Sequence, residues 1–528
     1  MALSDTAPFP ALDELTREVL NRSRSPEDHY EVAAVLESIG WSDKLARESF
    51  GVRDVFELAE NVCQSVRAKV VTEPAVAIEP PGLLPYVMRI FRSFLRGTIF
   101  AYPIAISIYS ILVLRYSLWS YMYFTVDIAT SIAIGTILSF MTVGGFMQAI
   151  ARRGFFYLIN NEYTMARRMT FYFIRLGLFI SVIVGATFFL FNLAFTIFPW
   201  NMILVCLFYY IFLTVCWLSV TVMYILRKEI VFTLLLSGGI ALVFILHEWL
   251  RVNIMLAQMV ALTLVSAAGL ALAAWIFRRA ERKSEEGITP PLPRMSIVFY
   301  TSIPYFTYGF LYFTFLYVDR IIAWSANDNY MPYLIWFRGE YELGLDWALL
   351  TLIIPMGLVE AMISDFYLRL EDNQKIYKAR EDHRFNSLYH SLYIRYLLYY
   401  CVLSIFSGLL IYFSILKIED MHIFDLTISI SKTTFFVFQW SVVAYVVTAA
   451  GLLGALFLFC LDYTGPVIRG ILWACAADVG VGFVLSRWVD YSWAVFGLLA
   501  GAVVFAGYTN LSVLRVLKKL DYHLYSSS

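Results

Sequence analysis

Charged side chains are scarce in this sequence. Only 15 % of the 528 residues are Asp, Glu, Lys or Arg, whereas 60 % are hydrophobic and the mean hydropathy is +0.70. Soluble domains carry about 25 % charged residues, so that class is excluded. The 40 basic and 40 acidic residues balance each other, and no basic excess is left to hold a nucleic acid. We therefore expect no nucleic-acid partner.

Motifs for metal, cofactor and catalytic chemistry are also missing. There is no glycine-rich nucleotide loop, no His-Glu-x-x-His sequence and no Ser, His and Asp grouping that one loop could assemble. The cysteines lack the spacing of metal ligands: Cys63, Cys206, Cys216, Cys401, Cys460 and Cys475. The start of the chain lacks the basic and apolar regions of a signal peptide. We expect no metal, no cofactor, no signal peptide and no enzymatic activity.

What the sequence has in abundance is long apolar runs. Each is about 20 residues or longer, enough to cross about 30 Å of hydrocarbon at 1.5 Å per residue. We predict twelve membrane spans: 98–117, 122–150, 170–198, 201–226, 229–247, 252–277, 296–324, 345–366, 389–415, 433–460, 464–486 and 490–514. The sequence predicts an all-α, polytopic membrane protein.

The loop 278–295 is basic and contains prolines, and it falls between six spans and six spans. We therefore expect two six-helix bundles, 98–277 and 296–514, related by an internal repeat. Within the spans, the only repeat signal is Thr98 with Pro103 and Thr301 with Pro304.

Lys and Arg fall almost entirely in every second gap between the spans. One set of gaps and the tail 515–528 hold about 20 of them, and the other set holds about six. The smaller set is Arg115, Arg251, Arg338, Lys417, Lys432 and Arg487. Because short loops rich in Lys and Arg stay in the cytoplasm, both termini are expected there. The expected location is the bacterial inner membrane.

The first 75 residues are less apolar, and their hydrophobic residues recur at helical spacing. Breaks fall at Ser25-Pro26, where Ser25 has the character of a helix cap, and at Gly40-Trp41. We expect residues 1–75 to form a small helical cytoplasmic domain.

A proline-containing linker and an amphipathic helix follow at 76–97. Arg89, Arg92 and Arg96 are three and four residues apart, so they share one helical face. Such a helix suits contact with the lipids of the cytoplasmic leaflet.

Ionisable groups inside the membrane are functional candidates, because burying them there is costly. In the span 296–324, Tyr305, Tyr308 and Tyr312 share a face with Asp319, which precedes Arg320. Aromatic faces can stack on sugar rings, and carboxylates accept hydrogen bonds from hydroxyl groups. The alternative is that the tyrosines only pack the helix. Further candidates within spans are Asp127, Arg175, Asp346, Arg395 and Asp478.

Four motifs lie in 310–377, one precedes the eleventh span and one ends the chain: Tyr317-Val318-Asp319-Arg320-Ile321-Ile322-Ala323-Trp324, Tyr341-Glu342-Leu343-Gly344-Leu345-Asp346, Ile354-Pro355-Met356-Gly357, Ser364-Asp365-Phe366-Tyr367, Leu461-Asp462-Tyr463 and Leu517-Lys518-Lys519-Leu520-Asp521-Tyr522-His523. Together they resemble the Pel-type exopolysaccharide exporter family of the multidrug/oligosaccharidyl-lipid/polysaccharide (MOP) flippase superfamily. The resemblance implies two six-helix bundles around a central path that passes a glycan.

The main functional hypothesis is an exporter or flippase for a polysaccharide or a lipid-linked glycan. One alternative is a membrane-embedded glycosyl- or acyltransferase with Asp319 or Asp127 as a base; His247 beside Glu248 is the only His-acid pair of the kind such enzymes use. Another is a scaffold for a cytoplasmic glycosyltransferase. Expected partners are the glycan, membrane lipids and a cytoplasmic glycosyltransferase or other biosynthesis subunits.

The charge pattern makes a topology prediction. Reporters fused after Arg294 and after Ser528 should report a cytoplasmic position, and one inserted at Asn327 an external position, because basic gaps alternate with gaps poor in Lys and Arg. Paired alkaline-phosphatase and fluorescent-protein fusions measure this. A cytoplasmic signal at Asn327 would overturn the twelve-span arrangement.

Overall fold

A computed structural model of the protein describes residues 12–22, 28–38, 40–72, 83–159, 162–282, 294–326, 333–376, 382–420 and 431–527. Within these residues the chain forms helices and one isolated β-bridge, between Tyr116 and Tyr121. The predicted all-α class is confirmed. The chain divides into two compact units: one contains Met1–Arg89 and Arg369–Lys378, and the other contains Ile90–Leu368 and Ala379–Ser528.

Four short helices lie in the first unit: α1 (Leu12–Arg22), α2 (His29–Ser38), α3 (Asp43–Phe50) and α4 (Val55–Thr72). They enclose a small core in which Leu15, Leu36 and Leu58 are fully buried. Gly51 ends α3 in the left-handed conformation, at φ 69°, which glycine adopts without strain. The expected cap at Ser25-Pro26 lies outside the described residues.

The second unit contains the membrane helices. The first bundle consists of α5 (Leu83–Leu114), α6 (Val126–Ile159), α7 (Tyr163–Phe195), α8 (Trp200–Ile225), α9 (Glu229–Phe244), the π-helix η1 (Ile245–Trp249) and α10 (Ile254–Glu281). The second consists of α11 (Met295–Trp324), α12 (Gly339–Leu349), η2 (Leu350–Leu352), α13 (Ile353–Ile376), α14 (Asp382–Asp420), α15 (Lys432–Cys460), α16 (Gly465–Trp488), η5 (Tyr491–Ala494) and α17 (Val495–Leu517), followed by the short α18 (Leu520–Ser527).

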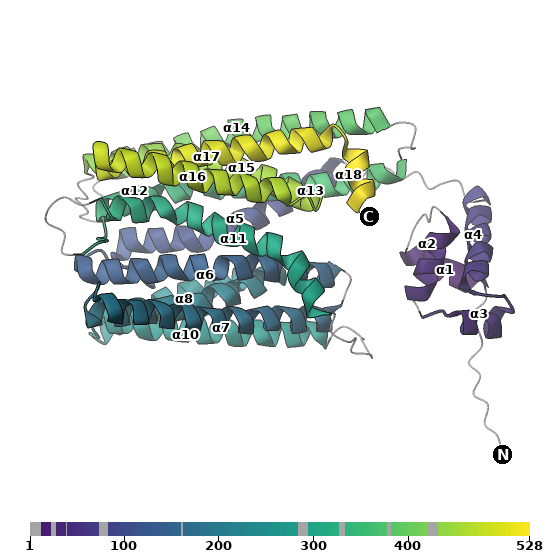
Figure 1. Ribbon diagram of the computed structural model, residues 1–528, viewed down its shortest axis with the longest axis horizontal. Helices are drawn as coiled ribbons and strands as arrows, with labels where there is room; N and C mark the ends of the chain where they lie inside the picture. The colour runs from purple at the N-terminus through teal and green to yellow at the C-terminus, as the bar shows by residue number, and fades with distance from the viewer. Residues whose placement is uncertain are drawn as a thin grey trace, which may run out of the picture. The chain divides into compact units, whose positions relative to one another are not determined.

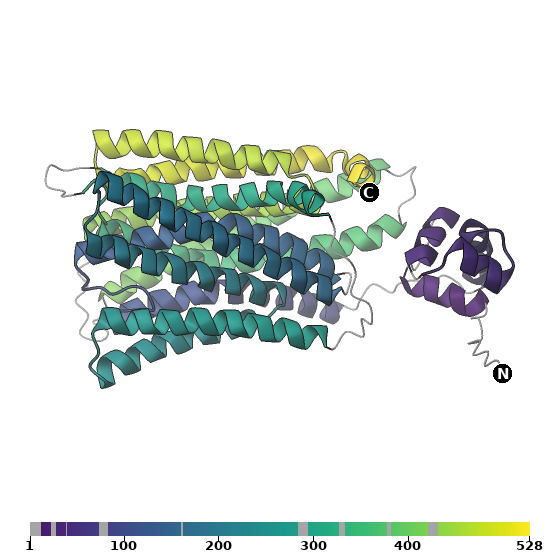
Figure 2. The same cartoon turned by 60° about the horizontal axis from the view of Figure 1, so that its bottom comes forward.

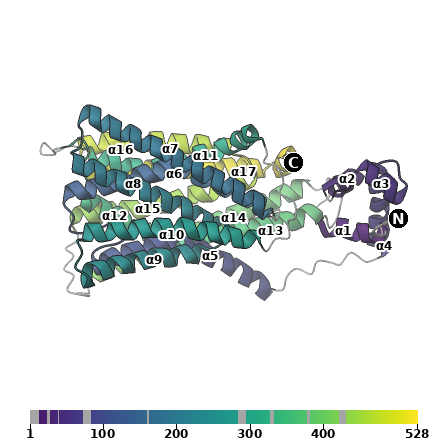
Figure 3. The ribbon, with the colours of Figure 1, turned by 90° about the horizontal axis from the view of Figure 1, so that it is seen from below.

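The helices of each bundle lie together. Figure 1 shows α14 to α17 gathered above and α6, α7, α8 and α10 below, with α11 between the two groups. Figures 2 and 3 show these long helices running side by side along one direction. The two-bundle arrangement expected from the position of the central basic loop is confirmed.

The twelve predicted spans all coincide with helices. Ten spans of the described chain are long and apolar enough to cross a membrane, one of them the broken span of α12 and α13, and α5 makes an eleventh as a pair of segments bent by 45°. The amphipathic segment and the first span thus belong to one bent helix. The twelfth, α11, misses the apolar criterion because it carries five tyrosines and the Asp319-Arg320 pair. Asn327 lies outside the described residues.

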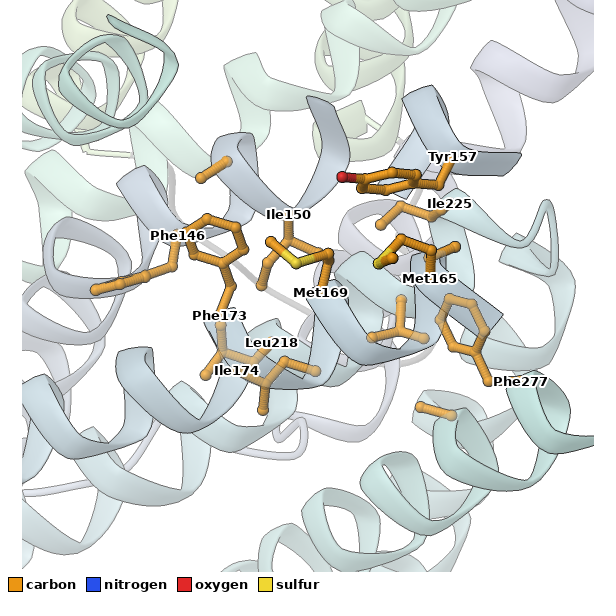
Figure 4. Packing of buried hydrophobic residues seen from close by; sticks show 14 of the residues in the cluster. Phe146, Ile150, Tyr157, Met165, Met169, Phe173, Ile174, Leu218, Ile225 and Phe277 are labelled. Carbon is orange, nitrogen blue, oxygen red and sulfur yellow. The ribbon is translucent and has the colours of Figure 1, made fainter. Parts of the chain in front are cut away.

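Apolar side chains fill the centre of the first bundle. Figure 4 shows Met165 and Met169 of α7 packed with Ile150 of α6 and Ile225 of α8. Phe277 of α10 closes the cluster. The flexible methionine side chains fill the irregular space between these helices.

Small residues bring the helices of the second bundle together. Gly451 of α15 faces the Phe505 ring of α17, and Gly501 of α17 faces the backbone of Ala474 on α16. A Cβ at Gly501 would lie 2.5 Å from the ring of Phe315 on α11 and 2.7 Å from the Ala474 carbonyl oxygen. Helices in membranes commonly approach through such residues, because lipid provides no hydrophobic drive for their association.

The two bundles meet where α5 crosses α13 and where α6 crosses α11. A Cβ on Gly97 of α5 would lie 2.7 Å from the carbonyl oxygen of Met356. A Cβ on Gly309 of α11 would lie 2.3 Å from the carbonyl oxygen of Gly144. Only glycine permits backbones to come this close, so glycines set the distance between the bundles.

The two crossings are equivalent in sequence as well as in contact. A separation of 212 positions relates four pairs of residues at the crossings: Phe94 and Phe306, Gly97 and Gly309, Gly144 and Met356, and Gly145 and Gly357. The Phe94 ring faces Gly357, just as the Phe306 ring faces Gly145. The same contacts at one constant separation indicate an internal repeat with an approximate two-fold axis.

The residues expected to mark this repeat are not equivalent positions. Thr98 and Thr301 are separated by 203 positions, and Pro103 and Pro304 by 201. Neither separation equals 212. The expectation of a repeat stands, but the Thr and Pro match was wrong, because helix crossings conserve contact geometry at glycines and not isolated Thr or Pro residues.

Replacing a crossing glycine should destabilise the protein. Gly309→Ala forces a methyl group against the Gly144 carbonyl, which we expect to cost about 1–3 kcal/mol. Gly480→Ala is the matched control, because a Cβ there meets nothing within 4 Å, and alanine in a helix is favoured over glycine by about 0.5–1 kcal/mol. Thermal unfolding of purified protein in detergent measures both. Equal melting temperatures for Gly309→Ala and wild type would contradict the crossing geometry.

Candidate functional site

A polar cluster lies inside the second bundle, built around Asp319 and Arg320 of α11. Both side chains are buried, at 0 % and 4 % exposure. The hydroxyl of Tyr341 on α12 donates a hydrogen bond of 2.8 Å to Asp319 Oδ2. No hydrogen-bond partner is recorded for the other carboxylate oxygen, Oδ1, among the described residues. One oxygen of this carboxylate is therefore buried without a hydrogen-bond partner among the described residues.

Arg320 connects this carboxylate to two others on α12. Its Nε donates to Glu342 Oε2 at 2.9 Å, and its Nη2 lies 3.9 Å from Asp346 Oδ1. Its guanidinium also lies 4.8 Å from the centre of the Tyr317 ring. Glu342 and Asp346 are four residues apart, so one helical face presents both acids to the arginine.

Asp478 of α16 adds a further buried carboxylate, which interacts electrostatically with Asp319. It is fully buried, and neither of its carboxylate oxygens has a hydrogen-bond partner within the part of the chain that the structure describes. Glycine makes room for it: a Cβ on Gly497 of α17 would lie 2.7 Å from Asp478 Oδ1. Tyr445 of α15, also buried, interacts through its hydroxyl with the Arg320 guanidinium.

The cluster holds more acids than bases. Glu342 and Asp346 lie 2.9 and 3.9 Å from the Arg320 guanidinium, and Asp319 and Asp478 bring the number of carboxylates to four. An uncompensated buried carboxylate costs several kcal/mol, and taking up a proton removes that cost. Among the described residues no group of three or more His, Cys, Asp or Glu is arranged to hold a metal ion. The chemistry that the cluster supports best is reversible proton uptake.

The predicted tyrosine stripe lies on the same helix, α11, seven to fourteen residues before Asp319. The rings of Tyr305 and Tyr308 are buried, and both contact Phe459 of α15 at 5.2 and 4.9 Å between ring centres. Tyr312 stacks on Tyr308 at 5.7 Å. The rings of Tyr305 and Tyr308 thus pack against α15; a role for the stripe in passing a glycan stays a prediction.

The remaining predicted residues separate into two groups. Asp346 and Asp478 belong to the cluster. Arg175 and Arg395 are exposed on α7 and α14, and Asp127 lies in the first turn of α6. The structure does not bring Asp127, Arg175 and Arg395 into the cluster.

Three participants were not among the residues predicted for the site: Tyr341, Glu342 and Tyr445. Tyr341 and Glu342 stand in the motif that ends at Asp346, and the four-residue spacing of Glu342 and Asp346 was the signal that could have found them. Tyr445 carries no such signal. His247, considered for an acyltransferase, has Nδ1 3.0 Å from the Val252 carbonyl oxygen, within the turn that follows the π-helix.

The C-terminal motif has a structural role. Asp521 Oδ1 accepts a hydrogen bond of 2.7 Å from the Asn386 side chain, and its backbone N–H donates back to Asn386 at 3.1 Å. The first of these bonds lowers the pKa of Asp521. His523 lies 5.2 Å from the ring of Tyr463. The motif thereby fastens α18 to α14 and to the turn between α15 and α16.

The fold has known counterparts. The crystal structure of the eukaryotic MATE transporter AtDTX14 matches with a TM-score of 0.58 at 12 % identity, over 84 % of this chain and 100 % of that one. A mutant of the Vibrio cholerae MATE transporter VcmN matches with a TM-score of 0.56 at 10 % identity, over 83 % and 98 %. An outward-facing MATE family transporter of the MOP superfamily matches with a TM-score of 0.50 at 12 % identity, over 81 % and 96 %.

No family model and no curated protein matches the sequence. At these identities the likeness concerns the fold alone. The chain has the two-bundle fold of MATE transporters.

Removing the single base of the cluster should be costly. Arg320→Gln leaves Glu342 without its ion pair in a buried place, and breaking a buried pair on one side costs about 3–5 kcal/mol. Arg395→Gln is the control, because that arginine is exposed and only its own helix backbone accepts from its Nε; we expect a change of at most about 0.5 kcal/mol. Denaturant unfolding in detergent compares the two, and equal losses would show that Arg320 does not hold the cluster together.

Proposed function

We propose that this protein is an inner-membrane exporter or flippase of the MOP superfamily that moves a polysaccharide or a lipid-linked glycan out of the cytoplasm. The path lies between the two six-helix bundles, and both termini are cytoplasmic. The fold supports the transporter class, because MATE transporters have the same two-bundle arrangement. The glycan cargo rests on the resemblance to the Pel-type exporters.

The observation that carries the proposal is the convergence of the resembling motifs. Asp319 and Arg320 come from one motif, and Tyr341, Glu342 and Asp346 come from another. In the structure these five residues form one network around the buried Asp319 and Arg320. Residues that share only helix packing would not need to pair carboxylates with an arginine inside a membrane.

Proton uptake at the cluster is the proposed source of energy. Asp478 and Asp319 are buried carboxylates with oxygens that have no recorded partner among the described residues. Protonation of these carboxylates changes the net charge between α11, α12 and α16, and no large ligand has to enter for this. The two protonation states then favour different packing of these helices, which is the requirement for coupling a gradient to transport.

The N-terminal helical domain is proposed to dock a cytoplasmic glycosyltransferase or another biosynthesis subunit. Its core of α1, α2, α3 and α4 is separate from those of the bundles. Docking would place the enzyme that makes the glycan beside the exporter that moves it.

Asp319→Asn tests the proposal. Asparagine keeps the shape and can still accept from Tyr341, but it carries no charge and takes up no proton, so export should be lost while the protein stays folded. Asp478→Asn should act in the same way. Tyr308→Ala, which removes one stacking surface of about 1 kcal/mol, should lower export without abolishing it.

Secreted polysaccharide is measured beside the amount of folded protein in membranes, at several values of the transmembrane pH gradient. Normal export by well-folded Asp319→Asn would remove this residue from the mechanism. Loss of export in proportion to loss of folded protein would return it to helix packing.

A further inference from the structure

A polar contact joins the two bundles close to the gaps that are rich in Lys and Arg, here called the basic end. Arg152, near the end of α6, has its Nη2 3.1 Å from Asp462 Oδ1. Asp462 lies in the turn between α15 and α16. The ion pair therefore links a helix of the first bundle to a turn of the second.

Tyr305 of α11 is the third member of this contact. Its hydroxyl donates a hydrogen bond of 2.6 Å to the same oxygen, Asp462 Oδ1, and its ring centre lies 5.1 Å from the Arg152 guanidinium carbon. Next to it, Arg153 Nε donates to Ser302 Oγ at 3.3 Å. The ring face attracts the cation while the hydroxyl binds the anion, so Tyr305 supports both charges of the pair.

The turn that carries Asp462 holds it in an uncommon conformation. Its φ is 53°, in the left-handed region, which aspartate tolerates better than most residues do. The following backbone N–H, that of Tyr463, donates to the Leu458 carbonyl at 2.9 Å. The contact of the Tyr463 ring with His523 braces the turn against α18. The backbone conformation of the turn, as well as the contacts with Arg152 and Tyr305, therefore fixes the direction of the Asp462 carboxylate.

The other crossing has an uncharged pair at the equivalent place. Ser93 and Tyr305 are separated by the same 212 positions as the crossing glycines, and so are Arg152 and Ser364. Ser93 Oγ lies 3.1 Å from Ser364 Oγ. The two bundles therefore touch at both equivalent points of the basic end. One contact is the ion pair of Arg152 and Asp462, and the other is the hydroxyl contact of Ser93 and Ser364.

We propose that Arg152, Asp462 and Tyr305 form a latch that holds the basic end of the bundle interface closed, and that this end opens to admit cargo only when the latch breaks. The proposal rests on the transport function proposed above, because a closed end matters only for a path between the bundles. It assigns a function to Asp462, which stands in a motif that the buried cluster does not use.

The ion pair of Arg152 and Asp462 is weak enough to break when the basic end opens. The side chains of Arg152 and Asp462 are 42 % and 59 % exposed, and exposed pairs contribute little. Tyr305, by contrast, is buried and stays in place on α11. Water can replace the lost partners of both charges, so opening leaves no charge buried.

The test uses a cross-link at the other crossing as a reporter. In full-length protein carrying Ser93→Cys and Ser364→Cys, the two thiols can form a disulfide only when the basic end is closed. A protease site in the loop 278–295 then separates the bundles on a gel unless the disulfide joins them. The single-cysteine variants control for the native cysteines.

Arg152→Glu places two acids together and should slow cross-linking at least about twofold, and Arg152→Glu with Asp462→Arg should restore the rate. Arg469→Glu, an exposed charge reversal at the same end, should leave it unchanged. Arg152→Gln, which is a milder change, repeats the test if Arg152→Glu is not recovered folded; it should also slow cross-linking.

Wild-type rates in folded Arg152→Glu and Arg152→Gln would overturn the latch, as would a swap that does not restore the rate. A latch variant that stops export while cross-linking normally would show that Arg152 contacts cargo, which overturns the latch and leaves the transport proposal standing. If cross-linking is slowed in the latch variants but even the wild-type protein exports no glycan, the latch is supported and the glycan cargo is overturned.

Discussion

The acidic centre of this protein depends on one guanidinium. Arg320 is the only base of the buried cluster among the described residues, and it binds Glu342 and lies beside Asp346 while its neighbour Asp319 binds Tyr341. Without it, α11 and α12 would bring like charges together in a medium that cannot solvate them. With it, Glu342 and Asp346 have a cation at 2.9 and 3.9 Å.

The two bundles share the geometry of their helix crossings but differ in the side chains that fill their interiors. Equivalent glycine crossings at a constant separation of 212 positions show the common geometry. The first bundle fills its centre with apolar side chains, among them Met165 and Met169. The second carries the acids of the polar cluster on α11, α12 and α16, and of these Asp319 and Asp478 are fully buried.

Much of the fold could be predicted, because apolar length is a local property of the sequence. The twelve spans follow from it, including α11 with its five tyrosines and the Asp319-Arg320 pair. The repeat could be expected but not aligned, since Gly97 and Gly309 are equivalent only through the carbonyl groups they approach. Of the site, Asp319, Arg320, Asp346 and Asp478 were predicted. Tyr445 joins them only through tertiary packing, which no spacing reveals.

The composition of α11 also affects how the membrane part is assembled. A helix with five tyrosines and an Asp-Arg pair gains little free energy from entering lipid by itself, since each charged residue opposes insertion by about 2.5–3.5 kcal/mol at the membrane centre. Its retention in the bilayer must then come from helices inserted before it. α6 is synthesised earlier and offers the backbone of Gly144 to Gly309. The crossing that sets the distance between the bundles would therefore also act during biogenesis, as the surface that receives α11.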